Sequence, residues 1–600
     1  MKNTHLLDGA QLSILNTRFE GVAKKMSNTL LRTGRSGVLN RARDFSCCVV
    51  THNDELLSSA ESLPIHVLSG PDLMAATMKA YHPKLKRGDA FLHNSPYHGC
   101  SHAADHTLLV PVIDEQGKHH FTVLAKAHQA DIGNSVPTTY HGNAKDVYEE
   151  GALIFAATKV QENYQSIEDI VRLCQLRIRA PKQWHGDFMA MIGAARIGEQ
   201  EILKLAEEFS WEVLHAFEAQ WFDYSERRMT SALKQLSPGK STASSTHDAM
   251  ENTGNQSVTI QAGVDINPDA GHISIDLRDN PDCLPCGLNL SEACARTAAM
   301  VGVFNSIDYS VPKNAGSFRR INIQLRENCV VGIPQHPTSC SVATTNIADR
   351  VSNAVQRGIS NLSTGFGMAE IGANLPPSRG VFSGVDPRSG NYFINQVFLG
   401  SSGGGASPHA DGWFHYSHAG NGGMGFIDSV ELAELYQPIH VICREIIPDS
   451  EGAGCQRGAP GKRIVFTTLE GTTVNIAYVT DGIDNPPQGA AGGAASEGAS
   501  QFLLDRNGIK TRLGNCELTC LQDHNTLVSI TSGGGGYGSP LCRDAELVAV
   551  DIHEGWLSPE RARTTYGVTL NEQGQVDHKK TTQLRRSLSA AKEHSEMSEL

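Results

Sequence analysis

Two short clusters of histidine and aspartate are the residues of this chain best suited to chemistry. They read His102-x-x-Asp105-His106 and His128-x-x-Asp131, and both lie in one histidine-rich stretch. Neutral imidazole and carboxylate suit borderline or hard divalent ions such as Zn, Mn or Fe. The spacing predicts that the clusters meet in space and hold such an ion. The alternative, in which a histidine-rich sequence groups its histidines without binding anything, stays open at this point.

Two further residues are candidates for the same chemistry. Asp44 opens a strand-like run, residues 41–51 (RARDFSCCVVT), and is either a third oxygen ligand or an aspartate that caps the strand or forms a salt bridge. Cys100 lies in the histidine-rich stretch and could act as a nucleophile with a histidine base. The sequence assigns no third residue that would orient such a base. A metal ion at this place would polarise a carbonyl or lower the pKa of water.

Glycine-rich runs are the second group of candidate binding elements. Residues 401–405 (SSGGG) and 532–538 (SGGGGYG) would either cradle an anion through backbone N–H groups or form tight turns and close packing. Residues 458–462 (GAPGK) resemble a P-loop but lack the Gly-x-x-x-x-Gly-Lys-Ser/Thr spacing. The sequence therefore predicts no P-loop nucleotide site.

Hydrophobic periodicity indicates which elements position these residues. Helical spacing of apolar residues predicts a helix over 10–34, a long helical segment over 167–236 and a helix over 291–306. Short apolar runs bounded by turns predict strands at 41–51, 90–93, 121–125, 258–262 and 273–277. Alternating residues and glycine turns between 458 and 550 indicate a β-rich region. The run 121–125 leads the chain into His128.

These elements predict a multidomain α+β fold, since 600 residues exceed one ordinary core. The expected parts follow one another along the chain: a mixed α/β metal-binding region (1–165), a helical segment (166–239), an α/β region with glycine-rich turns (240–440), a β-rich region (441–570) and a polar, poorly ordered tail (571–600).

Bulk composition excludes several classes of function. A net charge of -13 argues against nucleic acid as the main partner, because phosphate binding needs a basic face. No apolar run approaches the roughly 18 residues of a membrane span, and the start MKNTHLLDGAQ has no apolar signal region. The 14 cysteines are scattered, with a single CxxC. We therefore expect a cytoplasmic protein with reduced thiols and no membrane partner.

Short motifs recur in a recognisable order along the chain. They are LLRT (30–33), RDFSC (43–47), PIHV (64–67), NSPY (94–97), HAAD (102–105), AHQADIG (127–133), YEEG (148–151), GDF (186–188), GGGA (403–406), GAG (452–454), SGGGGYG (532–538), EGWLSPE (554–560) and YGV (566–568). With them, the chain to about residue 570 resembles the hydantoinase B/oxoprolinase family. That family comprises the metal-bearing subunits of ATP-dependent hydantoinases, lactamases and 5-oxoprolinase, with related subunits in acetone and acetophenone carboxylases.

The resemblance implies a specific ligand set. It places a divalent metal ion on Asp44, His102, Asp105 and His128, with Asp131 as an outer partner that orients His128. One departure concerns the substrate rather than the metal: residues 94–97 read NSPY where many members have Asn-Asp-Pro-Tyr.

The resemblance also implies a division of work within a hetero-oligomer. A hydantoinase A-like partner subunit, with an actin-like ATPase fold, would bind ATP and Mg and phosphorylate the amide or enol oxygen of the substrate. This chain would complete the reaction on a small cyclic amide such as a hydantoin, a lactam or 5-oxoproline, with Asp131 or His106 as the base. One alternative is a subunit of an ATP-dependent ketone carboxylase, which residues 422–425 (GGMG) favour. The other is a non-catalytic scaffold.

Overall fold

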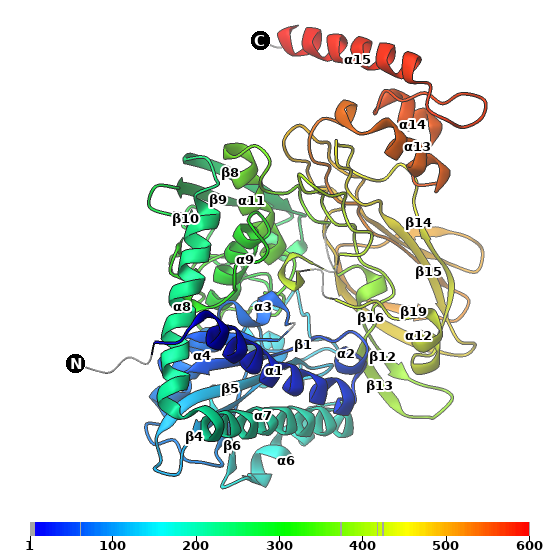
Figure 1. Ribbon diagram of the computed structural model, residues 1–600. Helices are drawn as coiled ribbons and strands as arrows, with labels where there is room; N and C mark the ends of the chain where they lie inside the picture. Colours follow the sequence, from blue (N-terminus) through cyan, green and yellow to red (C-terminus); the bar gives the residue numbers. More distant parts are fainter. Residues whose placement is uncertain (1–5, 61, 373–374, 417, 423–424, 599–600) are drawn as a thin grey trace.

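A seven-stranded antiparallel sheet is the framework of the N-terminal part of the computed structural model (Figure 1). The structure describes residues 6–60, 62–372, 375–416, 418–422 and 425–598. The strands are β1 (Phe45–Thr51), β2 (Leu56–Ser59), β3 (Ala90–His93), β4 (Asp105–Ile113), β5 (His119–His128), β6 (Thr158–Glu162) and β7 (Gln165–Ser166), in the spatial order β2-β1-β5-β4-β3-β6-β7. The central strands β1, β3 and β4 are buried along their whole length, so both faces of the sheet are covered.

The alternation of side chains along each strand decides what covers each face. Cys47 and Val49 of β1 pack in one apolar cluster with helices α1 (Gly9–Thr33) and α7 (Pro181–Phe209), whereas Cys48 and Val50 pack in another with α4 (Pro71–Tyr81). Neighbouring residues of a strand point to opposite faces, so the sequence position of a residue determines its side of the sheet. The helix predicted over 10–34 corresponds to α1, and the strand predicted over 41–51 corresponds to β1.

The helical segment lies where periodicity predicted it. It consists of α6 (Glu168–Arg177), α7 and α8 (Trp211–Leu233), and α8 runs from the N-terminal sheet toward the next one (Figure 1). The remaining helices of this half are short, namely α2 (Gly37–Asn40), α3 (Pro64–Val67) and α5 (Val147–Glu150).

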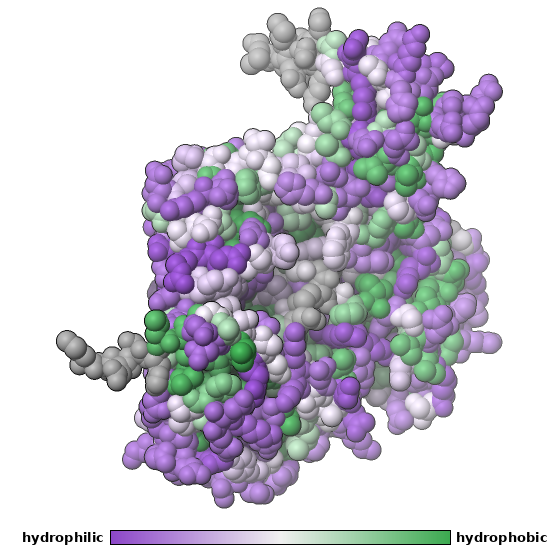
Figure 2. Space-filling model, viewed as in Figure 1, coloured by the Kyte–Doolittle hydropathy of each residue, from purple (hydrophilic) through white to green (hydrophobic). Residues whose placement is uncertain are grey.

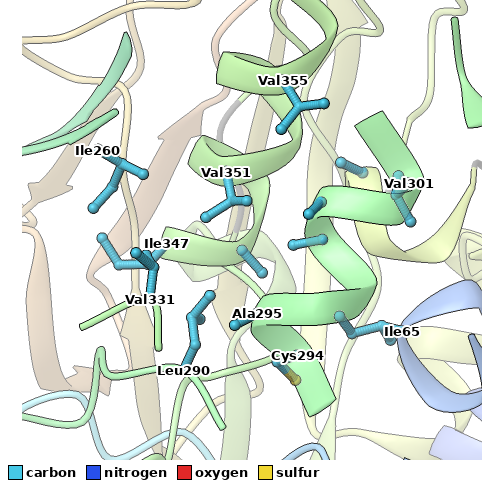
Figure 3. Packing of buried hydrophobic residues seen from close by; sticks show 14 of the residues in the cluster. Ile65, Ile260, Leu290, Cys294, Ala295, Val301, Val331, Ile347, Val351 and Val355 are labelled. Carbon is cyan, nitrogen blue, oxygen red and sulfur yellow. The ribbon is translucent and has the colours of Figure 1, made fainter. Parts of the chain in front are cut away.

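A second sheet and two helices form the largest apolar core. The sheet has the order β11-β10-β9-β8, with β8 (Gly239–His247), β9 (Val258–Asn267), β10 (His272–Asp276) and β11 (Ile321–Gln324). Helices α9 (Glu292–Phe304) and α11 (Ile347–Leu362) pack on each other beside it, and the short helix α10 (Ala315–Phe318) packs against α8. Val301 of α9 and Val351 of α11 belong to this cluster, and Ile65 of α3 reaches the same cluster beside α9 (Figure 3).

The C-terminal part is rich in strands, as alternation predicted. One sheet has the order β13-β12-β16-β19 and the other β14-β15-β20-β17-β18. Their strands are β12 (Val381–Val385), β13 (Tyr392–Gln396), β14 (Ile439–Ile446), β15 (Lys462–Thr468), β16 (Thr473–Val479), β17 (Ser500–Leu504), β18 (Lys510–Arg512), β19 (Cys516–Gln522) and β20 (Thr526–Ile530). Phe382 and Phe466 stack between the two sheets with ring centroids 5.5 Å apart. The α+β multidomain fold class is therefore confirmed, whereas the domain boundaries stay a prediction.

The two glycine runs pack against each other through their backbones. The N–H of Gly403 donates to the carbonyl oxygen of Ser532 at 3.1 Å, and the N–H of Ala406, directly after the first run, donates to the carbonyl oxygen of Gly535 at 2.9 Å. A Cβ atom at Gly534 would lie 2.0 Å from the carbonyl oxygen of Gly404. Only glycine permits this approach, so close packing explains the runs without an anion.

The chain ends in helices rather than in a poorly ordered tail. Helix α15 (His578–Ser598) lies in the segment 571–600, where we expected disorder. It follows helices α12 (Val430–Tyr436), α13 (Ala545–His553) and α14 (Pro559–Thr564). The segment is rich in strong helix formers, and Arg585 anchors it by donating to the carbonyl oxygens of Tyr566 and Arg543 at 3.0 and 2.6 Å. Polar composition thus predicted a poorly ordered segment where the structure has a helix.

The surface is mostly hydrophilic on the face shown in Figure 2, with scattered apolar residues and a hollow near its centre. Among the described residues, each helix is too short or too polar to span a bilayer. Gly423 and Met424, part of the run that favoured a carboxylase, lie outside the described residues.

Candidate metal centre

One end of the seven-stranded sheet brings the predicted ligands together. His128 ends β5 and Asp105 begins β4, and the two residues are direct antiparallel partners. Asp44 immediately precedes β1, and its carbonyl oxygen accepts a hydrogen bond from the N–H of His128 at 3.0 Å. His102 lies in the loop before β4. The register of β1, β5 and β4 therefore makes neighbours of residues that are far apart in the sequence.

Three of these residues form a compact buried cluster. The ligand atoms of His102, Asp105 and His128 all lie within 4.8 Å of one another. Asp105 Oδ1 lies 3.2 Å from His102 Nε2 and 3.1 Å from His128 Nδ1, and these two nitrogens are 3.2 Å apart. Three atoms that can each donate an electron pair thus converge on one point.

The proton of His102 shows why a cation fits this cluster. Its Nδ1 lies 2.8 Å from the carbonyl oxygen of Ser341, which can only accept, so Nδ1 carries the proton. If the ring is neutral, Nε2 carries no proton and its lone pair faces Asp105 Oδ1. Two electron-rich atoms at this distance repel each other unless a cation lies between them. That cation is either a second proton on Nε2, which Asp105 favours, or a metal ion that replaces this proton. The donor set therefore fits a divalent metal ion.

Neighbouring charges determine the ionisation of His102 and Asp105. Burial by itself lowers the pKa of His102, but attraction to Asp105 outweighs it, so the pKa stands above its ordinary value. Burial by itself raises the pKa of Asp105, but His102 and His66 outweigh it and hold that pKa well below its usual range. Asp105 is thus ionised, as a metal ligand must be.

His66 is a site residue that sequence reasoning missed. Its Nε2 lies 3.2 Å from Asp105 Oδ2 and 3.7 Å from Asp44 Oδ1, and its Nδ1 lies 3.1 Å from Ser46 Oγ. Helix α3 holds the imidazole, because the neighbouring Ile65 is anchored in the apolar core. The only signal in the sequence was the PIHV motif, which lies outside the histidine-rich stretch. His66 links the two carboxylates and is positioned to align them.

Other buried groups surround the cluster. Thr139 Oγ1 lies 3.1 Å from His128 Nε2, and the Tyr140 ring stacks on His128 with centroids 5.2 Å apart. Ser101 donates a hydrogen bond to Asp105. Burial raises the pKa of Tyr140 well above its ordinary value, so its phenol is neutral. These contacts orient the candidate ligands.

Asp131 lies away from the ring that it was expected to orient. Among the described residues its carboxylate pairs with Arg179 at 3.1 Å and accepts the N–H of Gly133 at 3.1 Å. The partners of His128 are instead Asp105, His102 and Thr139. The structure therefore gives Asp131 the role of holding a loop.

His106 points to the opposite face of the sheet from Asp105. The two residues are consecutive in β4, so their side chains alternate between faces. His106 Nδ1 accepts a hydrogen bond from Trp184 Nε1 at 3.4 Å on the side of α7, and burial lowers its pKa to about 3. The structure does not bring His106 to the cluster.

Cys100 is a buried structural residue in this arrangement. Its thiol donates to the carbonyl oxygen of Asp105 at 3.1 Å, and burial raises its pKa. A raised pKa keeps the thiol protonated and weakens it as a nucleophile. The interpretation of Cys100 as part of a cysteine–histidine pair is therefore not supported by its surroundings.

Replacing His66 by glutamine should weaken metal binding without abolishing it. We expect a loss of about 10- to 100-fold in affinity, the usual effect of removing a group that aligns a ligand. Competition with a chelator of known affinity measures this change. The exposed His409→Gln variant serves as the matched control, and equal affinities in the two variants would contradict the role of His66.

Comparisons with known proteins support one family assignment. The sequence model of the family described as Hydantoinase B/oxoprolinase matches residues 8–540. The beta subunit of a caprolactamase from Pseudomonas jessenii is 27% identical over 583 residues, covering 96% of this chain and 98% of that relative. A putative D-/L-hydantoinase subunit from Pseudomonas sp. (strain NS671) is 26% identical, covering 97% of this chain and 98% of that relative.

Solved structures show the same fold. The ATP-dependent caprolactamase from Pseudomonas jessenii matches with a TM-score of 0.86 at 25% identity, covering 97% of this chain and 100% of that chain. A nucleotide-free acetone carboxylase also matches with a TM-score of 0.86, covering 98% of this chain and 83% of that chain. Its identity is 18%, so this second likeness concerns the fold alone.

Proposed function

Because the chain belongs to the hydantoinase B/oxoprolinase family, we propose that it is the metal-dependent subunit of an ATP-dependent cyclic-amide hydrolase. The substrate class is a hydantoin, a lactam or 5-oxoproline. The observation that carries the proposal is the convergence of His102, Asp105 and His128 on one buried point, next to Asp44. This donor set suits a divalent ion of the Zn, Mn or Fe class.

The partner subunit has a defined task in this proposal. A hydantoinase A-like ATPase subunit phosphorylates the amide oxygen with ATP and Mg, which makes the carbon electrophilic and the oxygen a leaving group. Relatives of this chain are themselves named as subunits, one of a caprolactamase and one of a putative hydantoinase. On this chain, water adds to the activated carbon and the ring C–N bond breaks, with the nitrogen leaving as a protonated amine. A second water then hydrolyses the resulting acyl phosphate to carboxylate and inorganic phosphate.

The candidate centre supplies the second half of the reaction. A divalent ion held there would polarise a substrate oxygen and lower the pKa of a water molecule. Asp44 and Asp105 would supply the negative charge that holds a cation, and the rings of His102 and His128 would fix its position through nitrogens that carry no proton once the ion is bound. His66 keeps the two carboxylates aligned at 3.2 and 3.7 Å. Holding these groups in place before the reaction lowers the cost of reorganisation.

We assign to Arg379 and Tyr140 the binding of the phosphate group of the activated substrate. Arg379 is buried, with 2% of its surface exposed, and its positive charge is attracted to the carboxylate of Asp44. Burial by itself lowers the pKa of this guanidinium, but an arginine stays charged at neutral pH. A buried cation beside a neutral phenol can hold an anionic phosphate by charge-assisted hydrogen bonds.

A reconstituted complex tests the function. The chain is co-purified with its ATPase-type partner and assayed with hydantoins, caprolactam and 5-oxoproline, with and without ATP. We expect ring opening that requires both ATP and this chain, and no dependence on bicarbonate. Absence of ring opening for every cyclic amide would contradict the proposal.

A second candidate function uses the same centre for a different reaction class. This candidate is a subunit of an ATP-dependent ketone carboxylase. The sequence of residues 422–425 (GGMG) favours it, and the fold shared with acetone carboxylase is compatible with it. In that case, ATP-dependent consumption of acetone or acetophenone would require bicarbonate. A chain that binds no metal and supports neither reaction would instead be a non-catalytic scaffold.

A further inference from the structure

The far end of the N-terminal sheet carries a second cluster of metal-ligand side chains. His52 follows β1 directly, and His215 and Glu218 lie one turn apart on α8. Their ligand atoms all lie within 4.8 Å of one another, and Glu218 is buried while the two histidines are half-buried. We propose that His52, His215 and Glu218 form a second divalent-metal site, suited to Zn²⁺, that ties helix α8 to the end of strand β1.

The proton positions around His215 point to a cation. His120 Nε2 lies 2.8 Å from Asp114 Oδ2, and its Nδ1 lies 2.9 Å from His215 Nε2. A neutral His120 donates to the carboxylate, so its Nδ1 accepts and His215 Nε2 donates. If His215 is neutral, its Nδ1 carries no proton, and the lone pair of this nitrogen lies 3.2 Å from Glu218 Oε2. Two acceptors in contact need a cation between them.

The surroundings hold His215 in the orientation of a ligand. His120 stacks on Trp211 with ring centroids 3.7 Å apart and planes 7° from parallel, which fixes the imidazole that accepts from His215. Asp114 fixes the other nitrogen of His120. A carboxylate–histidine chain behind a ligating histidine is the usual outer support of a zinc site.

A third donor distinguishes a metal ion from a proton. A proton shared by His215 and Glu218 would need no further group, yet the His52 ring lies against His215 with centroids 5.3 Å apart. Two imidazoles and one carboxylate leave a fourth tetrahedral position for water, as Zn²⁺ prefers.

The local charges favour a cation as well. Lys79 and Lys118 are the cationic side chains that face His52, and Lys79 is already paired with Asp54 at 2.7 Å. Glu218, Asp114 and Asp54 outnumber these two lysines. The cluster therefore keeps a negative excess that a divalent ion would offset.

This site is separate from the candidate metal centre. Asp44 precedes β1 and His52 follows it, so the strand holds the two clusters roughly 25 Å apart at about 3.3 Å per residue. Neither cluster shares a ligand with the other. Loss of one site should leave the other intact, and the second site does not depend on the proposed reaction.

Zinc stoichiometry tests the inference. The full-length chain is stripped with a chelator, loaded with excess Zn²⁺, desalted and analysed by mass spectrometry for metal. We expect His215→Ala and Glu218→Gln each to bind one equivalent fewer than the unaltered chain. His102→Ala should lose a different equivalent, and the His102→Ala/His215→Ala double variant should lose both.

His440→Ala is the matched control, because His440 Nδ1 lies 3.0 Å from Glu434 in a pair of the same kind. No third donor completes that pair among the described residues, so zinc content should not change. Zn²⁺ should also raise the unfolding midpoint of His102→Ala but not of the double variant. Unchanged zinc content in both His215→Ala and Glu218→Gln, or no zinc left in His102→Ala, would overturn the inference.

Discussion

Replacing His102 by alanine is expected to remove the metal ion of the candidate centre and with it the activity of the complex. The variant deletes one of three donors that converge within 4.8 Å. Asp105 then loses the partner that lies 3.2 Å from its Oδ1 and stays buried beside His128. We expect ATP-dependent turnover to fall by at least about 10³-fold, since both carbonyl polarisation and water activation depend on the ion.

Metal analysis of the purified variant is the direct measurement, with turnover as the second. The substitution also leaves the buried carbonyl oxygen of Ser341 without the His102 donor, at a cost of about 1–3 kcal/mol. Asp105→Asn is therefore the second variant, because it removes the charge and nearly keeps the shape.

His106→Gln is the informative comparison, since His106 is a buried histidine of the same strand that faces α7. It should keep the metal ion. Full metal occupancy in both His102→Ala and Asp105→Asn would refute the centre.

Of these substitutions, Arg350→Met should lower the free energy of unfolding the most. Its guanidinium is 3% exposed and lies 2.8 Å from Asp481 and 3.4 Å from Glu370. It also donates to the carbonyl oxygen of Asn485 at 3.1 Å. These contacts join α11 to loops of the β-rich part. Removing Arg350 takes the arginine partner from buried Asp481 and leaves Glu370 with Arg357 at 2.9 Å. Breaking a buried ion pair by removing one partner costs about 3–5 kcal/mol.

The unfolding midpoint in denaturant measures this effect. Arg18→Met is the control, because its ion pair with Glu208 has 43% and 48% of the two side chains exposed and is screened by water. We expect a clear shift for Arg350→Met and almost none for Arg18→Met. Equal midpoints for the two variants would show that the buried network does not stabilise the fold.

The same network predicts a dependence of stability on pH. Burial by itself raises the pKa of Asp481, but Arg350 outweighs it and leaves this pKa below its ordinary value. A depressed pKa stabilises the fold above the pKa of an unfolded aspartate, about 3.9, and this contribution is lost as the pH falls through the folded value. Arg350→Met should lose this part of the acid dependence.

The sequence by itself determined most of the secondary-structure elements and which residue types could bind the metal ion. Alternation with period 2 and helical spacing depend only on neighbouring residues, so β1, β5, α1 and the helical segment could be predicted. The run leading into His128 pointed to a strand that ends at a ligand. The spacing of the histidine and aspartate clusters pointed to His102, Asp105 and His128, and the family resemblance added Asp44 to the ligand set.

Only the tertiary structure decided which of these side chains meet. His106 and Asp105 are neighbours in sequence, yet the strand sends them to opposite faces. His66 reaches the carboxylates because Ile65 is held in a core built largely by α9 and α11. Asp131 forms an ion pair with Arg179, a residue of the helical segment, rather than with a residue of the cluster.

The His52, His215 and Glu218 cluster has the same physical origin. Its members belong to two elements that no local pattern relates, the end of β1 and helix α8. Long-range packing and strand register place them together, and these depend on the whole chain rather than on any window of sequence. Local periodicity thus predicts which residues are available for chemistry, whereas the folded core determines which of them share a site.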